Sequence, residues 1–141
     1  MRGLLFVVLL AGCPSEPPPA CITVDTSCAP GYVPTFTNVY TNTISRSCGS
    51  DKNSCHSATG HMGGLSFEDE ATAYTKLLSD SGIDPSRKRV VPGDPACSLF
   101  VVRTNSPGKD YQMPPTNALD VREQCAIVQW VNNGAMMGSQ Q

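Results

Sequence analysis

Apolar residues recur at spacings of three and four in separate stretches of this chain, and no stretch shows the alternation typical of a strand. In the first stretch Phe36, Val39, Tyr40 and Ile44 share one face. Such a stripe is the side that a helix buries against its neighbours. The spacing therefore predicts a helix that begins at Phe36 and ends near Arg46.

A second helix is predicted between Ser66, which is expected to cap it, and Gly82. Its expected buried stripe consists of Ala71, Tyr74, Leu77 and Leu78.

A third helix is predicted to begin at Asp94-Pro95, because Asp is a good N-cap and Pro is preformed for the first helical position. It is expected to run to about Arg103. The apolar residues that it carries are Leu99, Phe100 and Val102.

The last predicted helix begins with a capping box of Asp120 and Glu123 and is stopped by Gly134. We expect Trp130 to pack this helix on the first one. The inward-facing residues are expected to be Val121, Cys125, Val128 and Val131. Because the connecting stretches are rich in Gly, Pro, Asn and Asp, the sequence predicts a small, all-α, loop-rich domain over residues 35–136.

The N-terminus has the pattern of an export signal. A positive Arg2 precedes an apolar run over residues 3–10, which closes on Ala11-Gly12-Cys13. The run is far shorter than the ~20 residues that span a bilayer as a helix. The pattern therefore predicts a lipoprotein signal peptide over residues 1–12, with Cys13 acylated as the mature N-terminus.

An acylated Cys13 predicts an exported protein held to a membrane by its lipid. Pro14 stands where inner-membrane retention signals place Asp, which favours the outer membrane, on its periplasmic or its surface face. Residues 13–34 form a lipidated tether in this interpretation, with a stiff proline-rich start. A small Cys21–Cys28 loop is expected within it.

The overall charge argues against nucleic-acid binding, because 10 Lys and Arg balance 12 Asp and Glu without a basic block. With two histidines in the chain, no Ser-His-Asp arrangement of a hydrolase is visible either, so we expect a carrier or binding module rather than an enzyme.

The seven cysteines of the chain indicate how the domain is held together. Apart from Cys13, they are Cys21, Cys28, Cys48, Cys55, Cys97 and Cys125, and an oxidising compartment favours covalent pairing among them.

One group of residues has the parts of a covalently held haem. Cys48 and Cys55 follow the first helix, His56 comes directly after Cys55, and Met113 precedes a rigid Pro-Pro pair. In this interpretation the two thiols bond the porphyrin edge, while His56 and Met113 ligate the iron from opposite sides. His/Met ligation raises the reduction potential, which suits an electron carrier.

At these residues the chain resembles the small cytochrome c-like domains of exported proteins in myxobacteria, planctomycetes and related bacteria. The resemblance spans roughly residues 36–135. Its remaining motifs are Val91-Pro92-Gly93-Asp94-Pro95 with Ser98-Leu99, Met113-Pro114-Pro115, and the closing Ile127-Val128-Gln129-Trp130-Val131-Asn132-Asn133-Gly134-Ala135.

The resemblance implies a haem c bound through Cys48, Cys55 and His56, with Met113 as the distal ligand. It also implies one-electron transfer to a redox protein partner. The family pattern has two residues between its cysteines, whereas six stand between these two. Attachment through both thiols therefore requires residues 49–54 to loop outward, because seven helical positions would separate the thiols by ~10 Å.

The alternative is a haem-free, disulfide-stapled interaction module with no cofactor. In it Cys48 pairs with Cys55, and Cys97 pairs with Cys125 to clamp the third helix to the last. A zinc site of Cys48, Cys55, His56 and His61 is a weaker alternative. The basic run at residues 87–89 is expected to be solvated, although in the haem interpretation it could meet the propionates.

Overall fold

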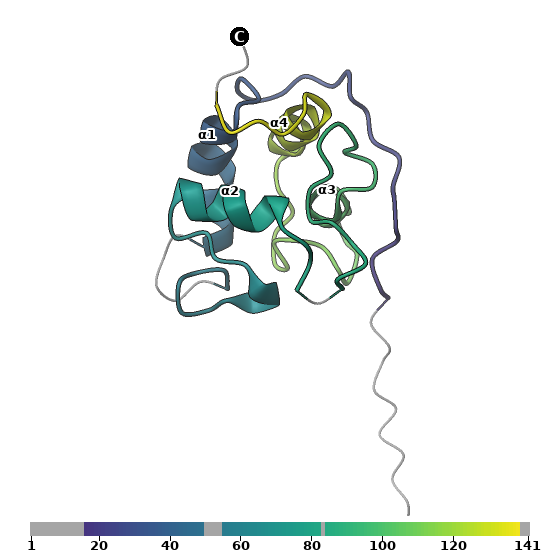
Figure 1. The fold of residues 1–141 in the computed structure, drawn as a ribbon. Coiled ribbons are helices and arrows are strands. Elements are labelled where there is room, and N and C mark those ends of the chain that lie inside the picture. Colours follow the sequence, from purple (N-terminus) through teal and green to yellow (C-terminus); the bar gives the residue numbers. More distant parts are fainter. Residues whose placement is uncertain (1–15, 50–54, 83, 139–141) are drawn as a thin grey trace, which may run out of the picture.

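The computed structural model describes residues 16–49, 55–82 and 84–138 as a helical, loop-rich body (Figure 1). Within these residues the regular secondary structure is helical, and the β-pairing is a single bridge between Asp80 and Lys88. None of the described helices has the length and apolarity needed to cross a bilayer. The predicted signal peptide and Cys13 lie outside the described residues. The helices are α1 (Phe36–Val39), η1 (Tyr40–Gly49), η2 (Met62–Gly64), α2 (Glu70–Leu78), α3 (Leu99–Thr104) and α4 (Val121–Asn132).

The first helix changes its hydrogen-bonding pattern part of the way along. The Thr35 hydroxyl caps α1 by accepting from the Asn38 amide at 3.3 Å. From Tyr40 the helix continues as the π-helix η1 as far as Gly49, three residues past the predicted end. The apolar spacing predicts the helix but not the switch, because it does not report which carbonyl each amide bonds.

The predicted cap of the second helix is wrong. Asp69 is the N-cap of α2, and its carboxylate accepts from the Thr72 amide at 2.9 Å. Ser66 is instead buried ahead of the helix. With this later start, Ala73 and Leu77 are buried at a spacing of four, while Ala71 is exposed.

The third helix begins later than predicted as well. Asp94 starts a turn, in which its carboxylate accepts from the Cys97 amide at 3.1 Å. Its carbonyl accepts from the Ser98 hydroxyl at 2.7 Å, and α3 begins only at Leu99. Asp-Pro favours a turn as much as a helix start, so the sequence alone does not separate the two.

The last helix begins and ends as predicted. Both hydrogen bonds of the Asp120–Glu123 capping box are present, and Gly134 follows α4 with a φ of 96°. The inward assignment fails for Val121, which is 73% exposed, because the first residue of α4 lies at the rim of the domain. The other three predicted inward residues are buried.

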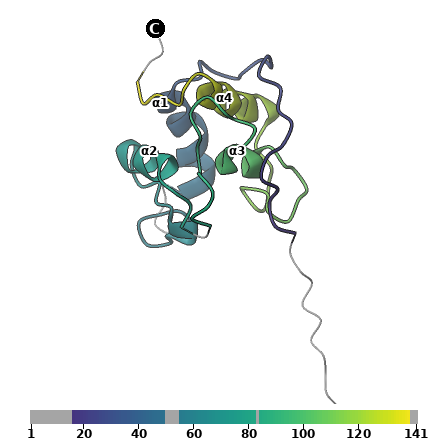
Figure 2. The ribbon, with the colours of Figure 1, turned by 45° about the vertical axis from the view of Figure 1, so that its right-hand side comes forward.

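The core lies where α1 and α4 meet. The Phe36 ring lies 5.0 Å from Trp130 of α4 and 5.1 Å from Tyr74 of α2, which confirms that Trp130 packs the last helix on the first. The Trp130 indole donates to the Met136 carbonyl at 2.9 Å, so its polar atom is satisfied inside the core. Figure 2 shows α1 and α4 beside each other, with α2 and α3 below them in the view.

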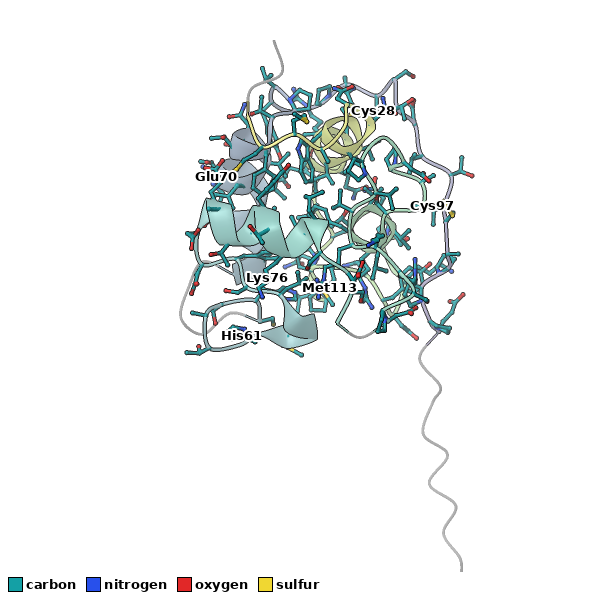
Figure 3. All side chains as sticks on the ribbon, in the orientation of Figure 1. Cys28, His61, Glu70, Lys76, Cys97 and Met113 are labelled. Atoms are coloured by element: carbon teal, nitrogen blue, oxygen red, sulfur yellow. A yellow bond between two sulfur atoms is a disulfide. The ribbon has the colours of Figure 1, made fainter. Side chains whose placement is uncertain are left out.

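The predicted disulfide pairings are wrong, although all four cysteines are bridged. Cys21 pairs with Cys97 and Cys28 pairs with Cys125, so both bridges join the N-terminal segment to the helical body. Figure 1 shows the reason, because this segment runs along the outside of α3 and α4. Figure 3 places Cys97 beside the segment and Cys28 beside α4. On that path Cys21 lies close to Cys97 and Cys28 lies close to Cys125, so the two cysteines of the segment bond the helical body and not each other.

Candidate functional site

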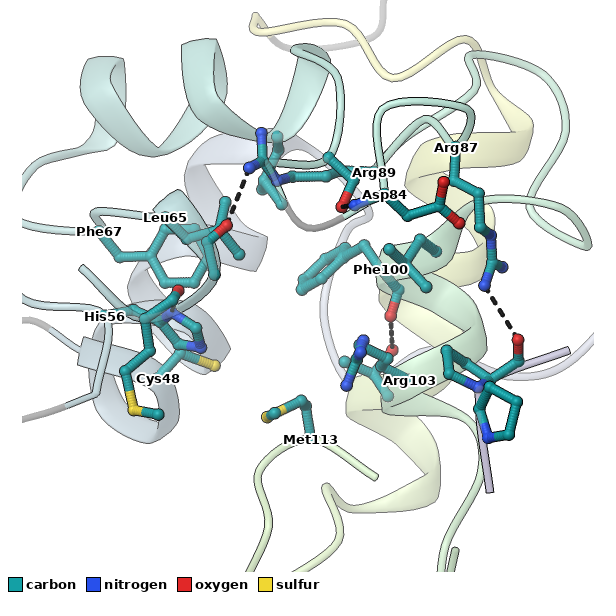
Figure 4. Close-up of a pocket in the computed structure, with 18 residues that line it drawn as sticks. Cys48, His56, Leu65, Phe67, Asp84, Arg87, Arg89, Phe100, Arg103 and Met113 are labelled. Atoms are coloured by element: carbon teal, nitrogen blue, oxygen red, sulfur yellow. Dashed lines mark hydrogen bonds between the residues drawn. The ribbon is translucent and has the colours of Figure 1, made fainter. Parts of the chain in front are cut away.

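A cavity of about 370 Å³ opens between η1, the loop around η2, α3 and the loop that carries Met113 (Figure 4). It is large enough for a sizeable organic group, and most of its wall is apolar. Its apolar lining includes Leu65, Phe67, Leu77, Leu99 and Phe100.

His56 enters this cavity in a fixed orientation. Its Nδ1 lies 2.9 Å from the Met62 carbonyl oxygen, and its ring centroid lies 5.2 Å from that of Phe67. With the proton on Nδ1, donated to that carbonyl, the Nε2 lone pair is free to bind a metal. Burial is the main cause that lowers the pKa of His56, which favours the neutral imidazole that metals bind.

Met113 lines the same cavity from the loop after α3. Its backbone amide donates to the Arg103 carbonyl at 2.9 Å, which ties the loop to the end of that helix. The neighbouring Gln112 side chain accepts from the Gly108 amide at 2.6 Å and donates to the Pro114 carbonyl at 2.7 Å. These hydrogen bonds fix the backbone on both sides of Met113 at the cavity wall.

Cys48 lines the cavity from the last turn of η1, whereas Cys55 is exposed. Neither is bridged, so the Cys48–Cys55 disulfide expected in the haem-free alternative is not formed. Burial raises the pKa of Cys48 to about 12, and Glu123 adds to the effect, so this thiol stays protonated at neutral pH.

Gly49 brings the end of η1 against the residue that follows Cys55. A Cβ at Gly49 would lie 2.7 Å from the His56 carbonyl carbon, closer than real contacts allow. The chain thus leaves Gly49 and returns to it within a few residues. Residues 50–54 lie outside the described residues, but the two ends of the insert meet, as attachment through both cysteines requires.

Three arginines line the cavity, and each has a different set of partners. Arg89 is buried and donates to the carbonyls of Lys76 at 3.1 Å and Gly63 at 3.0 Å, and it also bonds Asp80 O and the Ser79 hydroxyl. These contacts make it a structural tie between the loops around α2. Of the basic run at residues 87–89, Lys88 turns away from the cavity to pair with Asp80.

Arg103 was not singled out by the sequence, although it lies one helical turn after Leu99 on the cavity face of α3. It donates to the Tyr111 carbonyl at 3.3 Å. Burial lowers its pKa, and the nearby charge of Arg87 lowers it further. Among the described lining residues, the three arginines stand against one carboxylate, Asp84, so the wall carries a positive excess.

This donor set fits a haem. A neutral imidazole and a thioether, the axial pair of a high-potential haem, line one apolar cavity together with a thiol. The positive excess matches the two propionates that a haem carries. The zinc alternative gains no support, because in the described part of the chain no three His, Cys, Asp or Glu side chains lie together as ligands. His61 lies at the periphery, away from Met113, as Figure 3 shows.

Comparison with known families supports the same conclusion. Residues 53–117 match the family model described as planctomycete cytochrome C, a stretch that includes Cys55, His56 and Met113 but begins after Cys48. No curated protein and no solved structure matches the chain. This match supports a cytochrome c-like domain in the chain.

Proposed function

We propose that this protein is a lipid-anchored electron carrier that holds a haem c between His56 and Met113. The observation that carries the proposal is that His56, Met113 and Cys48 line one apolar cavity, although they are far apart in sequence. A bound haem iron supplies a one-electron couple, and His/Met ligation sets it at a raised potential.

The protein's own part is to position two ligands before the cofactor arrives. The Met62 carbonyl holds the His56 ring, and the Arg103 carbonyl holds the backbone of Met113. Because both partners are backbone atoms of the fold, the ligands need little rearrangement on binding. Preorganised ligands of this kind favour rapid electron exchange, since few groups move when the charge changes.

The cavity wall is expected to exclude water and to balance charge. Its apolar residues keep the local dielectric low, which strengthens every charge interaction inside it. Arg103 would meet a dianionic cofactor from the α3 side, opposite Cys48. This asymmetry gives the cavity one end for thioether attachment and another for anions.

Attachment through two thioethers rests on the contact between Gly49 and His56. Cys48 directly precedes Gly49, and Cys55 directly precedes His56. The contact between Gly49 and His56 therefore brings the backbone next to each cysteine together. Each thiol would add across a vinyl group, with its sulfur bonding one carbon and its hydrogen going to the other. No oxidant is needed for that addition.

The N-terminal pattern indicates where the protein would be held and therefore where it would exchange electrons. An acylated Cys13 would hold the protein at the outer membrane, where it would pass electrons to or from another redox protein.

The second candidate is a haem-free interaction module that keeps the cytochrome-like fold. It is favoured by the two disulfides that staple the domain, since such bridges could replace the stability that a cofactor provides. The unbridged state of Cys48 and Cys55 speaks against it.

The deciding experiment is the intact mass and visible spectrum of the mature protein, made with a haem-attachment system. We expect the mass of one haem in addition to the chain and a sharp α-band on reduction. Met113→Ala should then shift the absorption and lower the reduction potential, because the thioether is lost. A colourless protein, lighter only by the hydrogens of its disulfides, would favour the second candidate. A red Met113→Ala protein with an unchanged spectrum would show that the distal ligand is another residue.

A further inference from the structure

The cavity has a wall that lies outside the stretch matched to the cytochrome family. Pro17 and Pro18 line it, although they precede the first helix and were expected to belong to a free tether. We call residues 16–20 the strap. It borders the cavity on the side of Arg87, where a dashed line in Figure 4 marks a hydrogen bond from that residue.

Arg87 holds the strap through its guanidinium group. Its Nη1 donates to the Pro18 carbonyl at 3.0 Å, and its Nη2 donates to the carbonyls of Pro19 at 2.7 Å and Ala20 at 3.2 Å. The planar fork of an arginine suits several acceptors at once, and hydrogen bonds from a charged donor are the stronger kind. One side chain thus grips three consecutive residues.

Both ends of the strap are secured as well. At its start, Glu16 pairs with Lys109 at 3.8 Å. At its other end, Cys21 is bridged to Cys97, and the next amide, that of Ile22, donates to the Ala96 carbonyl at 2.9 Å. The disulfide and this hydrogen bond leave the strap little freedom to swing away at its C-terminal end.

The composition of the strap suits a wall rather than a linker. Proline has no backbone N–H, so the carbonyls of Pro18 and Pro19 can accept from Arg87 while these two residues present no amide donor that needs a partner at the cavity wall. Its rings add apolar surface to an apolar cavity, and its fixed φ keeps the segment extended. Without the strap, this side of the cavity would expose apolar side chains to water, which is unfavourable.

We infer that the strap retains the ligand in the cavity and that Arg87 is the positioning residue that keeps the strap closed. The identity of the ligand as haem rests on the proposed function, whereas the closure of an apolar cavity by the strap does not. The segment between the lipidated cysteine and the helical domain is then part of the binding site.

The test compares ligand release from the full chain and its variants, prepared without a haem-attachment system and loaded with haemin. Arg87→Gln removes the grip, and a Pro17→Gly, Pro18→Gly double variant removes the rings. Lys88→Gln is the matched control, since it removes the same charge one residue away at an exposed ion pair. Transfer of haemin to excess apomyoglobin should be about tenfold faster for the first two variants. Arg87→Gln loses hydrogen bonds from a charged donor, and the double glycine variant loses the rings that cover the cavity. The rate of transfer should stay unchanged for the control.

Combining the changes separates a positioning role from direct contact. If Arg87 acts through the strap, adding Arg87→Gln to the double glycine variant should speed release little further, because the two changes remove one feature. If the two effects multiply, Arg87 binds the ligand itself and the inference is overturned. Equal release rates in Arg87→Gln, the double glycine variant and the control would also overturn it.

A probe without iron keeps this test independent of the haem proposal. Anilinonaphthalene sulfonate fluoresces on exposed apolar surface, and near-UV circular dichroism checks that each variant is folded. Arg87→Gln and the double glycine variant should bind more dye than Lys88→Gln. If wild type fails to take up haemin but this dye difference appears, the strap inference stands and the haem proposal fails. If no folded variant binds more dye than the control, the strap inference fails whatever haemin does.

Discussion

The six cysteines that follow the predicted lipidation site divide between two sides of the molecule. On the stapled side, made of residues 21–34 with α4 and the turn before α3, four cysteines form two bridges, Cys21–Cys97 and Cys28–Cys125. On the cavity side, around His56, Cys48 and Cys55 stay as thiols. One side is held by covalent bonds between distant segments, and the other by packing and hydrogen bonds between backbone atoms.

This difference shows that a small domain can place its stabilising disulfides on one side and its reactive thiols on the other. Bridges that close long loops restrict the unfolded chain most, and these two span 76 and 97 residues. None of the four bridged cysteines lines the cavity. The cavity side keeps its thiols available for chemistry and relies on close backbone contacts, such as that of Gly49 with His56.

Breaking the stapled side should have the largest effect on stability. Replacing both Cys28 and Cys125 by Ser should lower the free energy of unfolding by about 4 kcal/mol, because a long loop is no longer closed. Chemical denaturation of the two proteins measures this difference. Cys55→Ser is the control and should cost less than about 0.5 kcal/mol, since the residue is exposed and unbridged. Equal losses in the two variants would contradict the division between the sides.

Adding a single methyl group on the cavity side should have the next largest effect on the free energy of unfolding. Gly49→Ala places a Cβ 2.7 Å from the His56 carbonyl carbon at a φ of 156°, and should cost about 2–3 kcal/mol. Gly93→Ala is the matched control, because Gly93 has a φ of 83° but no atom near its Cβ position. We expect thermal unfolding to show a clearly smaller loss in the control. A Gly49→Ala protein as stable as Gly93→Ala would mean that the contact with His56 is easily relieved.

The smallest predicted effect concerns the charge of the cavity and leaves stability nearly unchanged. Arg103→Gln should weaken haemin binding by about 1–1.5 kcal/mol, because a half-buried guanidinium no longer faces the propionates. Binding of haemin dimethyl ester, which lacks the two negative charges, should change much less. Arg46→Gln, at an exposed position of η1, is the control. An equal loss for haemin and its diester would show that Arg103 does not recognise the anionic groups.

Features with a local cause could be predicted from the sequence. The Asp120–Glu123 capping box needs only residues three apart, and the stripe on α4 is enough to turn Trp130 towards Phe36. The start of α3 was missed because the same Asp94-Pro95 pair serves a turn. The disulfide pairing was missed because it depends on the path of the N-terminal segment, which no local pattern encodes.

The candidate site shows the same limit to what the sequence can predict. The resemblance to cytochromes pointed to Cys48, Cys55, His56 and Met113, and the structure brings all of these except the exposed Cys55 to one cavity. The remainder of the wall could not be found this way. Nothing in the spacing of the chain places Pro18 beside Arg87 or distinguishes Arg103 from any other arginine at the end of a helix, since both depend on tertiary packing.

The meeting of Gly49 with His56 has a consequence for how such domains can diverge. When the two ends of a surface loop are already fixed against each other, extra residues between them add little, since doubling the length of a loop costs only about 0.6 kcal/mol. The number of residues between Cys48 and Cys55 is then free to drift while the cavity behind them keeps its shape. A search that demands two residues between the cysteines would pass over this chain, in which six residues stand between Cys48 and Cys55.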